Sequence, residues 1–363
     1  MSPPLDRLLD REDTPPGMFI GVIELPSHTA MIGLFGGLVL LYAAGQALVG
    51  TDSGSPAKRA VAQWLPVALT AIMTLLMRRS DLAIGIVFAT SVAALALGIG
   101  SAAAGGTINS NVDRTRRLWP FVLPTALLAL LAGFSGQLNW IHAMILLVEG
   151  LVLLALGMDR SGSEFYDAQT EVGDSRPATA LPWPAIELVL GILLAILGAW
   201  LAAHFTVIAS GQVQALGGTA VATIILGPGL VLSMLGRGTA LATEGRASES
   251  ISAYVLLTLL NLCFLLPMII LLGYLVPGLR EIGSSLWHAH AMPPGALSLV
   301  VEGAKPIVYP LPIWRLDTVL LVVLGLILLP AALGRWQLGR REGVGIIFGY
   351  WTYLLIAVAL AGR

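Results

Sequence analysis

The chain has 363 residues, of which 56% are hydrophobic and only 11% charged, about half the charged fraction of a soluble domain. This composition excludes an ordinary soluble domain and indicates a membrane protein with several spans. The one cysteine, Cys263, excludes both a disulfide framework and a thiolate metal cluster, and the net charge of −1 points to no class of partner.

The sequence contains apolar runs that approach the roughly 17–25 residues needed to cross a bilayer as a helix. We expect ten spans, at about 30–50, 60–77, 82–103, 118–135, 140–158, 184–208, 215–236, 250–275, 317–334 and 343–361. A polar tail, residues 1–28, precedes them and lacks the apolar core and cleavage site of a signal peptide. The sequence therefore predicts an all-α, polytopic membrane protein.

The longest clearly polar connector, residues 159–182, divides these spans into two halves of five, 29–158 and 183–363. The halves resemble each other: QLNWIHAMILLVEG at 137–150 and QLGRREGVGIIFGY at 337–350 fall at the same place in the fifth and tenth spans. An odd number of spans in each half gives the two copies opposite topology. We therefore expect two inverted five-helix repeats, the second with an insertion at 276–314.

Lysine and arginine are distributed unevenly between the two sides of the membrane. Twelve of the 20 fall in the connectors on the side of residues 159–182, and the other eight lie on the side of the termini. Because short cytoplasmic loops carry the positive excess, we expect the 159–182 linker in the cytoplasm, both termini and the 276–314 insertion outside, and a location in the cell (inner) membrane.

Two helix pairs at corresponding places of the halves carry prolines and small polar residues. In the first, Pro66 lies within the second span, and the third span carries Thr90 and Ser91. In the second, Gly227-Pro228-Gly229 lies within the seventh span, and the eighth carries Thr258 and Asn261. Because proline removes a backbone N–H and clashes with a carbonyl, we expect both proline-bearing helices to be broken.

The sequence around these pairs is similar to a known family. Leu65-Pro66 and the segment Asp81-Leu82-Ala83-Ile84-Gly85 match the first repeat of the cation/calcium exchanger superfamily, and Tyr350 and Tyr353 are similar to its last helix. The chain thus resembles the membrane region of sodium/calcium exchangers. The resemblance implies ten helices in two inverted repeats, with ion ligands on the two proline-bearing helices and on the helix after each.

The chain departs from the family at the ligand positions. The resemblance places the two hallmark glutamates at Val67 and Gly229, and a hallmark asparagine at Ala94. Calcium takes about six to eight oxygen ligands, normally including carboxylates. We therefore expect a divergent transporter that is not a standard Ca²⁺ exchanger, with its substrate bound by four polar residues of these helices: Thr90, Ser91, Thr258 and Asn261.

One further acid and one histidine pair are candidates for other chemistry. Glu149 lies near the middle of the fifth span, where an ionisable side chain is a candidate proton or cation site, although the resemblance places that helix outside the ion site. His288 and His290 lie two residues apart in the insertion, but the spacing fixes no third ligand. We predict no metal site, no cofactor, no nucleic-acid partner and no enzymatic activity, since no catalytic motif is found.

Two hypotheses follow from these features. In the first, the chain is a divergent secondary transporter of a monovalent cation, a proton or a small neutral solute. In the second, it is a non-transporting scaffold on an exchanger-like fold, with a protein partner that docks on the proline-containing insertion 276–314. A polar central cavity lined by the four residues favours the first hypothesis, and a dry core favours the second.

Overall fold

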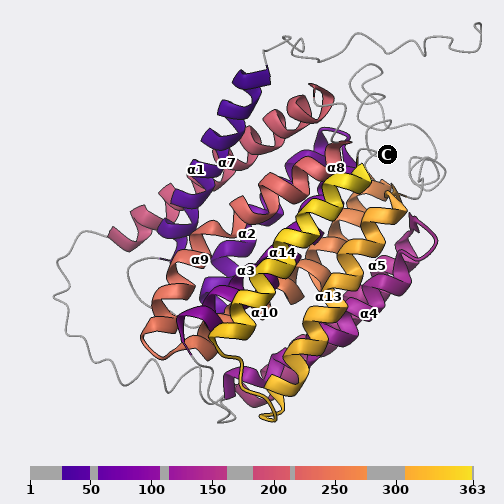
Figure 1. Ribbon diagram of the computed structural model, residues 1–363. Helices are drawn as coiled ribbons and strands as arrows, with labels where there is room; N and C mark the ends of the chain where they lie inside the picture. The colour runs from indigo at the N-terminus through magenta and orange to yellow at the C-terminus, as the bar shows by residue number, and fades with distance from the viewer. Residues whose placement is uncertain are drawn as a thin grey trace, which may run out of the picture.

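The computed structural model describes residues 27–49, 56–106, 114–161, 183–212, 217–275 and 307–361. In these ranges the chain is helical apart from short turns and one pair of two-residue strands. Eight helices are long and apolar enough to cross a membrane, and shorter apolar helices cover Leu118–Ala132 and Trp140–Ala155. The predicted all-α, polytopic membrane fold is confirmed (Figure 1).

The helices follow the predicted spans in order. Those of the first half are α1 (Ser27–Val49), α2 (Pro56–Leu76), α3 (Ser80–Gly105), the 3₁₀-helix η2 (Arg114–Phe121) with α4 (Val122–Ala132), and α5 (Trp140–Ser161). Those of the second half are α7 (Trp183–Gln212), α8 (Gly217–Val221) with α9 (Gly227–Thr243), α10 (Ala247–Leu260), α13 (Leu311–Ala332) and α14 (Arg340–Ala361). The helix of α10 continues to Leu275.

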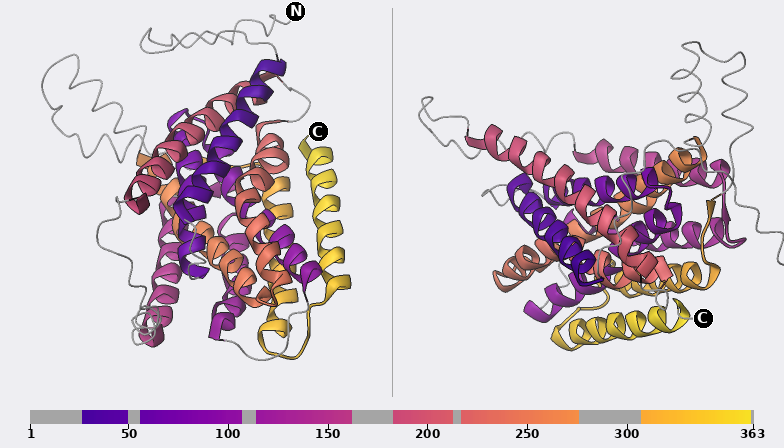
Figure 2. Two further views of the ribbon diagram at one scale, coloured as in Figure 1. Left: turned by 90° about the vertical axis from the view of Figure 1, so that its left-hand side faces the viewer. Right: turned by 90° about the horizontal axis from the view of Figure 1, so that it is seen from above.

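Helix α3 is the centre of the bundle. Nearly all of its side chains are buried, and it packs against α2, α9, α10, α13 and α14 (Figures 1 and 2). The start of α1 and the end of α14 lie at the same end of the bundle (Figure 2), as an even number of crossings requires. We call this end of the bundle the terminal end and the other the linker end.

Helices α1 and α7 cross closely because glycine occupies the contact. A Cβ atom on Gly37 would lie 2.6 Å from the backbone nitrogen of Ala202, and one on Gly198 would lie 3.0 Å from the carbonyl oxygen of Gly37. Small residues let helix backbones approach in a membrane, where the lipid supplies no hydrophobic drive for helices to associate. Gly36, the neighbour of Gly37, faces open space.

The predicted breaks at Pro66 and at Gly227-Pro228-Gly229 are wrong. Helix α2 is α-helical through Pro66, whose carbonyl oxygen also accepts a hydrogen bond from Thr70 Oγ1 at 2.8 Å. In the second half, a π-turn (Ala222–Leu226) joins α8 to α9 without interruption just before Pro228. In a π-turn the backbone hydrogen bonds span five residues instead of four. The wider turn leaves room for the proline ring while the helix continues.

A short antiparallel pair connects the two halves at the terminal end. Strand β1 (Gln137–Leu138) follows α4, and β2 (Ile307–Val308) precedes α13. The N–H of Tyr309 extends the contact by donating to the carbonyl oxygen of Gly136 at 3.4 Å. Most of the predicted insertion, residues 276–306 with His288 and His290, lies outside the described residues, whereas residues 311–314 belong to α13.

Candidate functional site

The polar residues predicted on α3 and α10 are fully buried, and three of them meet. Thr90, Ser91, Thr258 and Asn261 are each 0% exposed. Asn261 Nδ2 donates to Ser91 Oγ at 3.3 Å, and Thr258 Oγ1 lies 3.5 Å from the Ser91 carbonyl oxygen. Thr90 instead donates within α3, to the carbonyl oxygen of Ile86 at 2.5 Å. We call these four residues the central cluster.

The central cluster is neutral and contains one unsatisfied oxygen. Asn261 Oδ1 is buried and accepts no hydrogen bond from any described residue. Asn261 also begins a π-turn (Asn261–Leu265), an irregularity often found at functional sites. A buried acceptor without a donor is costly, so this oxygen is suited to a ligand that supplies positive charge or a hydrogen.

The positions at which the resemblance places the two hallmark glutamates are packed with apolar groups. Val67 is fully buried in the hydrophobic core, as is Ala94 at the asparagine position, and a Cβ on Gly229 would lie 2.8 Å from the side chain of Leu38. No group of three or more histidine, cysteine, aspartate or glutamate side chains gathers anywhere in the described ranges. The described residues therefore provide no carboxylate cage for a divalent cation.

Gln63 connects the two helices that carry these positions. Its side-chain amide donates to the carbonyl oxygen of Leu230, and its side-chain oxygen accepts from Ser233 Oγ. Both partners lie on α9, close to Gly229. The buried Gln63 amide, hydrogen-bonded through both its nitrogen and its oxygen, fixes α2 against α9. This contact lies where the resemblance predicts ligands of the ion.

Glu149 lies on α5, against the π-turn that begins at Asn261. Its Oε1 accepts from Thr125 Oγ1 at 2.7 Å, and its buried Oε2 has no hydrogen-bond partner among the described residues. Thr125 also contacts Cys263 Sγ, at 3.9 Å, within that π-turn. The structure therefore places Glu149 next to the helix segment that carries the central cluster, although no hydrogen bond joins the two.

A second buried acid, Asp317 on α13, was not identified from the sequence. It is 0% exposed; Oδ1 accepts from Tyr353 at 2.7 Å, and Oδ2 lies 3.4 Å from the hydroxyl of Tyr309. In the part of the chain that the structure describes, no lysine, arginine or histidine forms an ion pair with it. The predicted span began at 317 and put this residue at the membrane surface, whereas α13 begins at Leu311.

The described ranges contain ten apolar helices, one of which is the buried central helix α3, and these define an all-α polytopic membrane protein. No protein-family model matches the sequence, and no curated protein matches it. Solved structures of exchangers do match its fold.

The structure of native YfkE gives a TM-score of 0.61 at 12% identity, covering 92% of this chain and 93% of that one. The H⁺/Ca²⁺ exchanger CAX gives 0.60 at 12% identity, covering 93% and 86%. The sodium-calcium exchanger NCX_Mj gives 0.54 at 16% identity, covering 92% and 99%. The chain has the fold of the cation/calcium exchangers over nearly its whole length.

Proposed function

We propose that this chain is a divergent secondary transporter on the exchanger fold, and that its cargo is a monovalent cation, a proton or a small neutral solute rather than Ca²⁺. The observation that carries the proposal is the buried, unpartnered Oδ1 of Asn261 within the neutral central cluster. An amide oxygen and hydroxyls can replace part of the hydration shell of a singly charged ion. They cannot compensate a dication, because the cost of burying an ion grows steeply with its charge.

The proposal includes a membrane location and an orientation for the chain. The chain lies in the cell (inner) membrane, with both termini and the 276–314 insertion outside and the 159–182 linker in the cytoplasm. The excess of lysine and arginine at the linker end supports this orientation. Residues 29–158 and 183–363 form the two inverted repeats, and the central cluster takes one helix from each repeat.

A second function, a non-transporting scaffold, is favoured by the contacts of the central cluster with itself and by the continuity of the neighbouring helices. Asn261 is hydrogen-bonded to Ser91, and α2 and α9 continue through the prolines where exchanger-like helices were expected to break. In this alternative the 276–314 insertion presents a surface to a protein partner. The two functions differ in whether an ion gradient drives flux.

Flux into proteoliposomes that contain the full chain tests the proposal. Na⁺, K⁺, H⁺ and Ca²⁺ gradients are screened one at a time, and we expect one of the first three, or a neutral solute coupled to it, to drive uptake. Asn261→Ala removes the unpartnered oxygen and should reduce the rate about tenfold or more. Glu149→Gln should reduce it as well if the cargo or coupling ion is a proton.

The matched control is Thr206→Val, since Thr206 is equally buried but its hydroxyl only donates within α7, to the carbonyl oxygen of Ala202 at 2.6 Å. This variant should keep the wild-type rate. Uptake driven only by Ca²⁺ would contradict the proposed cargo. No uptake under any gradient, with Asn261→Ala indistinguishable from wild type, would support the scaffold.

A further inference from the structure

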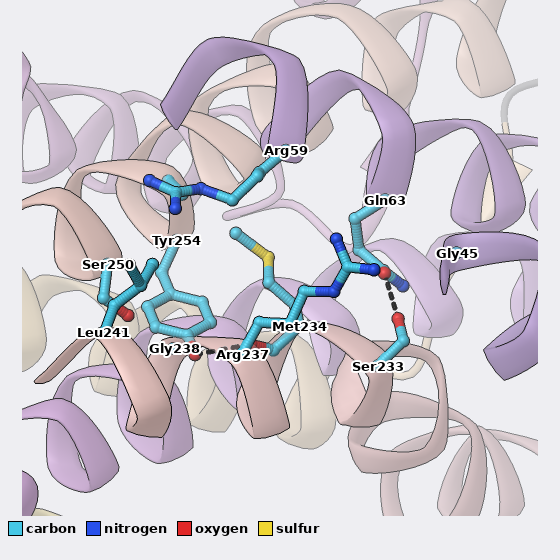
Figure 3. Close-up of a pocket in the computed structure, with 11 residues that line it drawn as sticks. Gly45, Arg59, Gln63, Ser233, Met234, Arg237, Gly238, Leu241, Ser250 and Tyr254 are labelled. Carbon is cyan, nitrogen blue, oxygen red and sulfur yellow. Dashed lines mark hydrogen bonds between the residues drawn. The ribbon is translucent and has the colours of Figure 1, made fainter. Parts of the chain in front are cut away.

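A cleft at the linker end is lined by side chains from both halves of the chain. It lies between α1, α2, α9 and α10 (Figure 3). Two arginines, Arg59 and Arg237, line it, and none of the described residues that line it is acidic. Its volume of about 20 Å³ suits one water-sized group, so it can take part of a ligand that extends out of it.

Arg59 carries unsatisfied donors in this cleft. It is 5% exposed, and its Nε and Nη2 form no hydrogen bond with any residue in the described ranges. Its Nη2 forms an ion pair with Glu249 Oε2 at 3.6 Å. That carboxylate already accepts two hydrogen bonds from Arg246, at 2.9 and 2.7 Å, so the charge of Arg59 is only partly compensated.

A second unsatisfied group lies in the same cleft. Ser250 is 2% exposed, and its Oγ has no hydrogen-bond partner among the described residues. Other polar groups of the cleft are engaged, since Tyr254 donates to the carbonyl oxygen of Met234 at 3.1 Å and Arg237 Nε donates to Gln46 at 2.7 Å. Figure 3 shows the guanidinium groups of Arg59 and Arg237 on either side of Met234.

The backbone adds positive potential at the same place. Arg59 and Ser250 each lie in the first turn of a helix, of α2 and α10 respectively, where the positive end of the helix dipole favours an anion. The backbone N–H of Ser250 itself already donates to the carbonyl oxygen of Arg246 at 3.4 Å. Val61, two residues after Arg59 on α2, and Leu232, next to Ser233 on α9, are exposed apolar residues. A ligand with an anionic head and an apolar body therefore fits this position.

We propose that this cleft binds a phosphate group through Arg59 Nε and Nη2 and Ser250 Oγ. Arginine matches the oxygens of a phosphate with paired donors, and basic pockets between membrane helices hold anionic headgroups. The phosphate comes from an anionic phospholipid or from free phosphate in solution. Phosphate binding at the linker end does not require the chain to be a transporter.

The test measures binding to the purified full chain. In one arm, inorganic phosphate is titrated in detergent and the thermal unfolding temperature is followed. In the other, native mass spectrometry counts lipids retained after exposure to phosphatidylglycerol, with phosphatidylcholine as the reference lipid. Arg59→Gln should weaken binding about tenfold or more, and Ser250→Ala about threefold, as charged and neutral hydrogen bonds differ.

The matched control is Arg341→Gln, the same change of charge on an exposed residue of α14 at the same end of the bundle. It should bind as the wild type does. Stabilisation by inorganic phosphate identifies free phosphate, and selective retention of phosphatidylglycerol identifies a lipid headgroup. The proposal is overturned if neither probe binds, or if Arg59→Gln and Ser250→Ala bind both probes as tightly as the control.

Discussion

Gly37→Leu is expected to lower the free energy of unfolding by about 3 kcal/mol, the upper part of the usual range for overpacking. The added side chain would start 2.6 Å from the backbone of Ala202, and a backbone atom cannot move aside without displacing its helix. Helices α1 and α7 would therefore have to separate along their whole contact. Denaturant unfolding of the purified chain in micelles measures the change.

The neighbouring glycine gives the matched control. A Cβ on Gly36 meets no atom within 4 Å, so Gly36→Leu adds the same side chain on the exposed face of α1. It should change the free energy of unfolding by no more than about 0.5 kcal/mol. Equal losses for the two variants would show that helix propensity or insertion, and not the α1–α7 contact, controls the result.

Asp317→Ala is expected to cost about 1.5–3 kcal/mol of unfolding free energy. The substitution removes the acceptor of Tyr353 and leaves that buried hydroxyl, on a different helix, without its partner. Tyr309, beside β2, loses a longer contact to the same carboxylate. Asp317→Asn keeps one acceptor oxygen and should fall between the wild type and the alanine variant.

A double-mutant cycle separates this contact from general damage to α13. Tyr353→Phe is combined with Asp317→Ala, and we expect a coupling energy of about 1.5–3 kcal/mol. The control is Thr318→Val, because Thr318 is equally buried but its hydroxyl only donates within α13, to the carbonyl oxygen of Trp314 at 2.7 Å. A coupling energy near zero would refute the stabilising role of the Asp317–Tyr353 hydrogen bond.

The sequence predicts the helices well because a long apolar run has few alternatives in a bilayer. It predicts the ends of the helices poorly, because apolar residues that face lipid and polar residues of the membrane surface are mixed near a helix end. For α13 this error had a consequence: a boundary at 317 instead of Leu311 hid a fully buried aspartate. An ionisable residue inside a membrane span is a functional candidate. A predicted span that began at 311 would therefore have identified Asp317 as one.

The candidate site is predictable only in part. The polar residues at corresponding places of the two halves could be proposed from the sequence, and two of them, Ser91 and Asn261, do meet in the bundle. The phosphate cleft could not be proposed, because Arg59 and Ser250 are 191 positions apart in the sequence and no local pattern connects them. The continuity of α2 and α9 was also missed, since proline in a soluble helix is a stronger breaker than proline packed among membrane helices.

The π-turns at Ala222–Leu226 and Asn261–Leu265 affect how this chain must be compared with any relative. Each π-turn fits an additional residue into the helix, so side chains beyond it are rotated by about 100° from an uninterrupted α-helix. Both occur in the second half, whereas α2 and α3 are α-helical throughout. An alignment of the two proposed repeats therefore requires a one-residue gap inside a helix at each π-turn. Without that gap, exposed residues of one half are matched to core residues of the other.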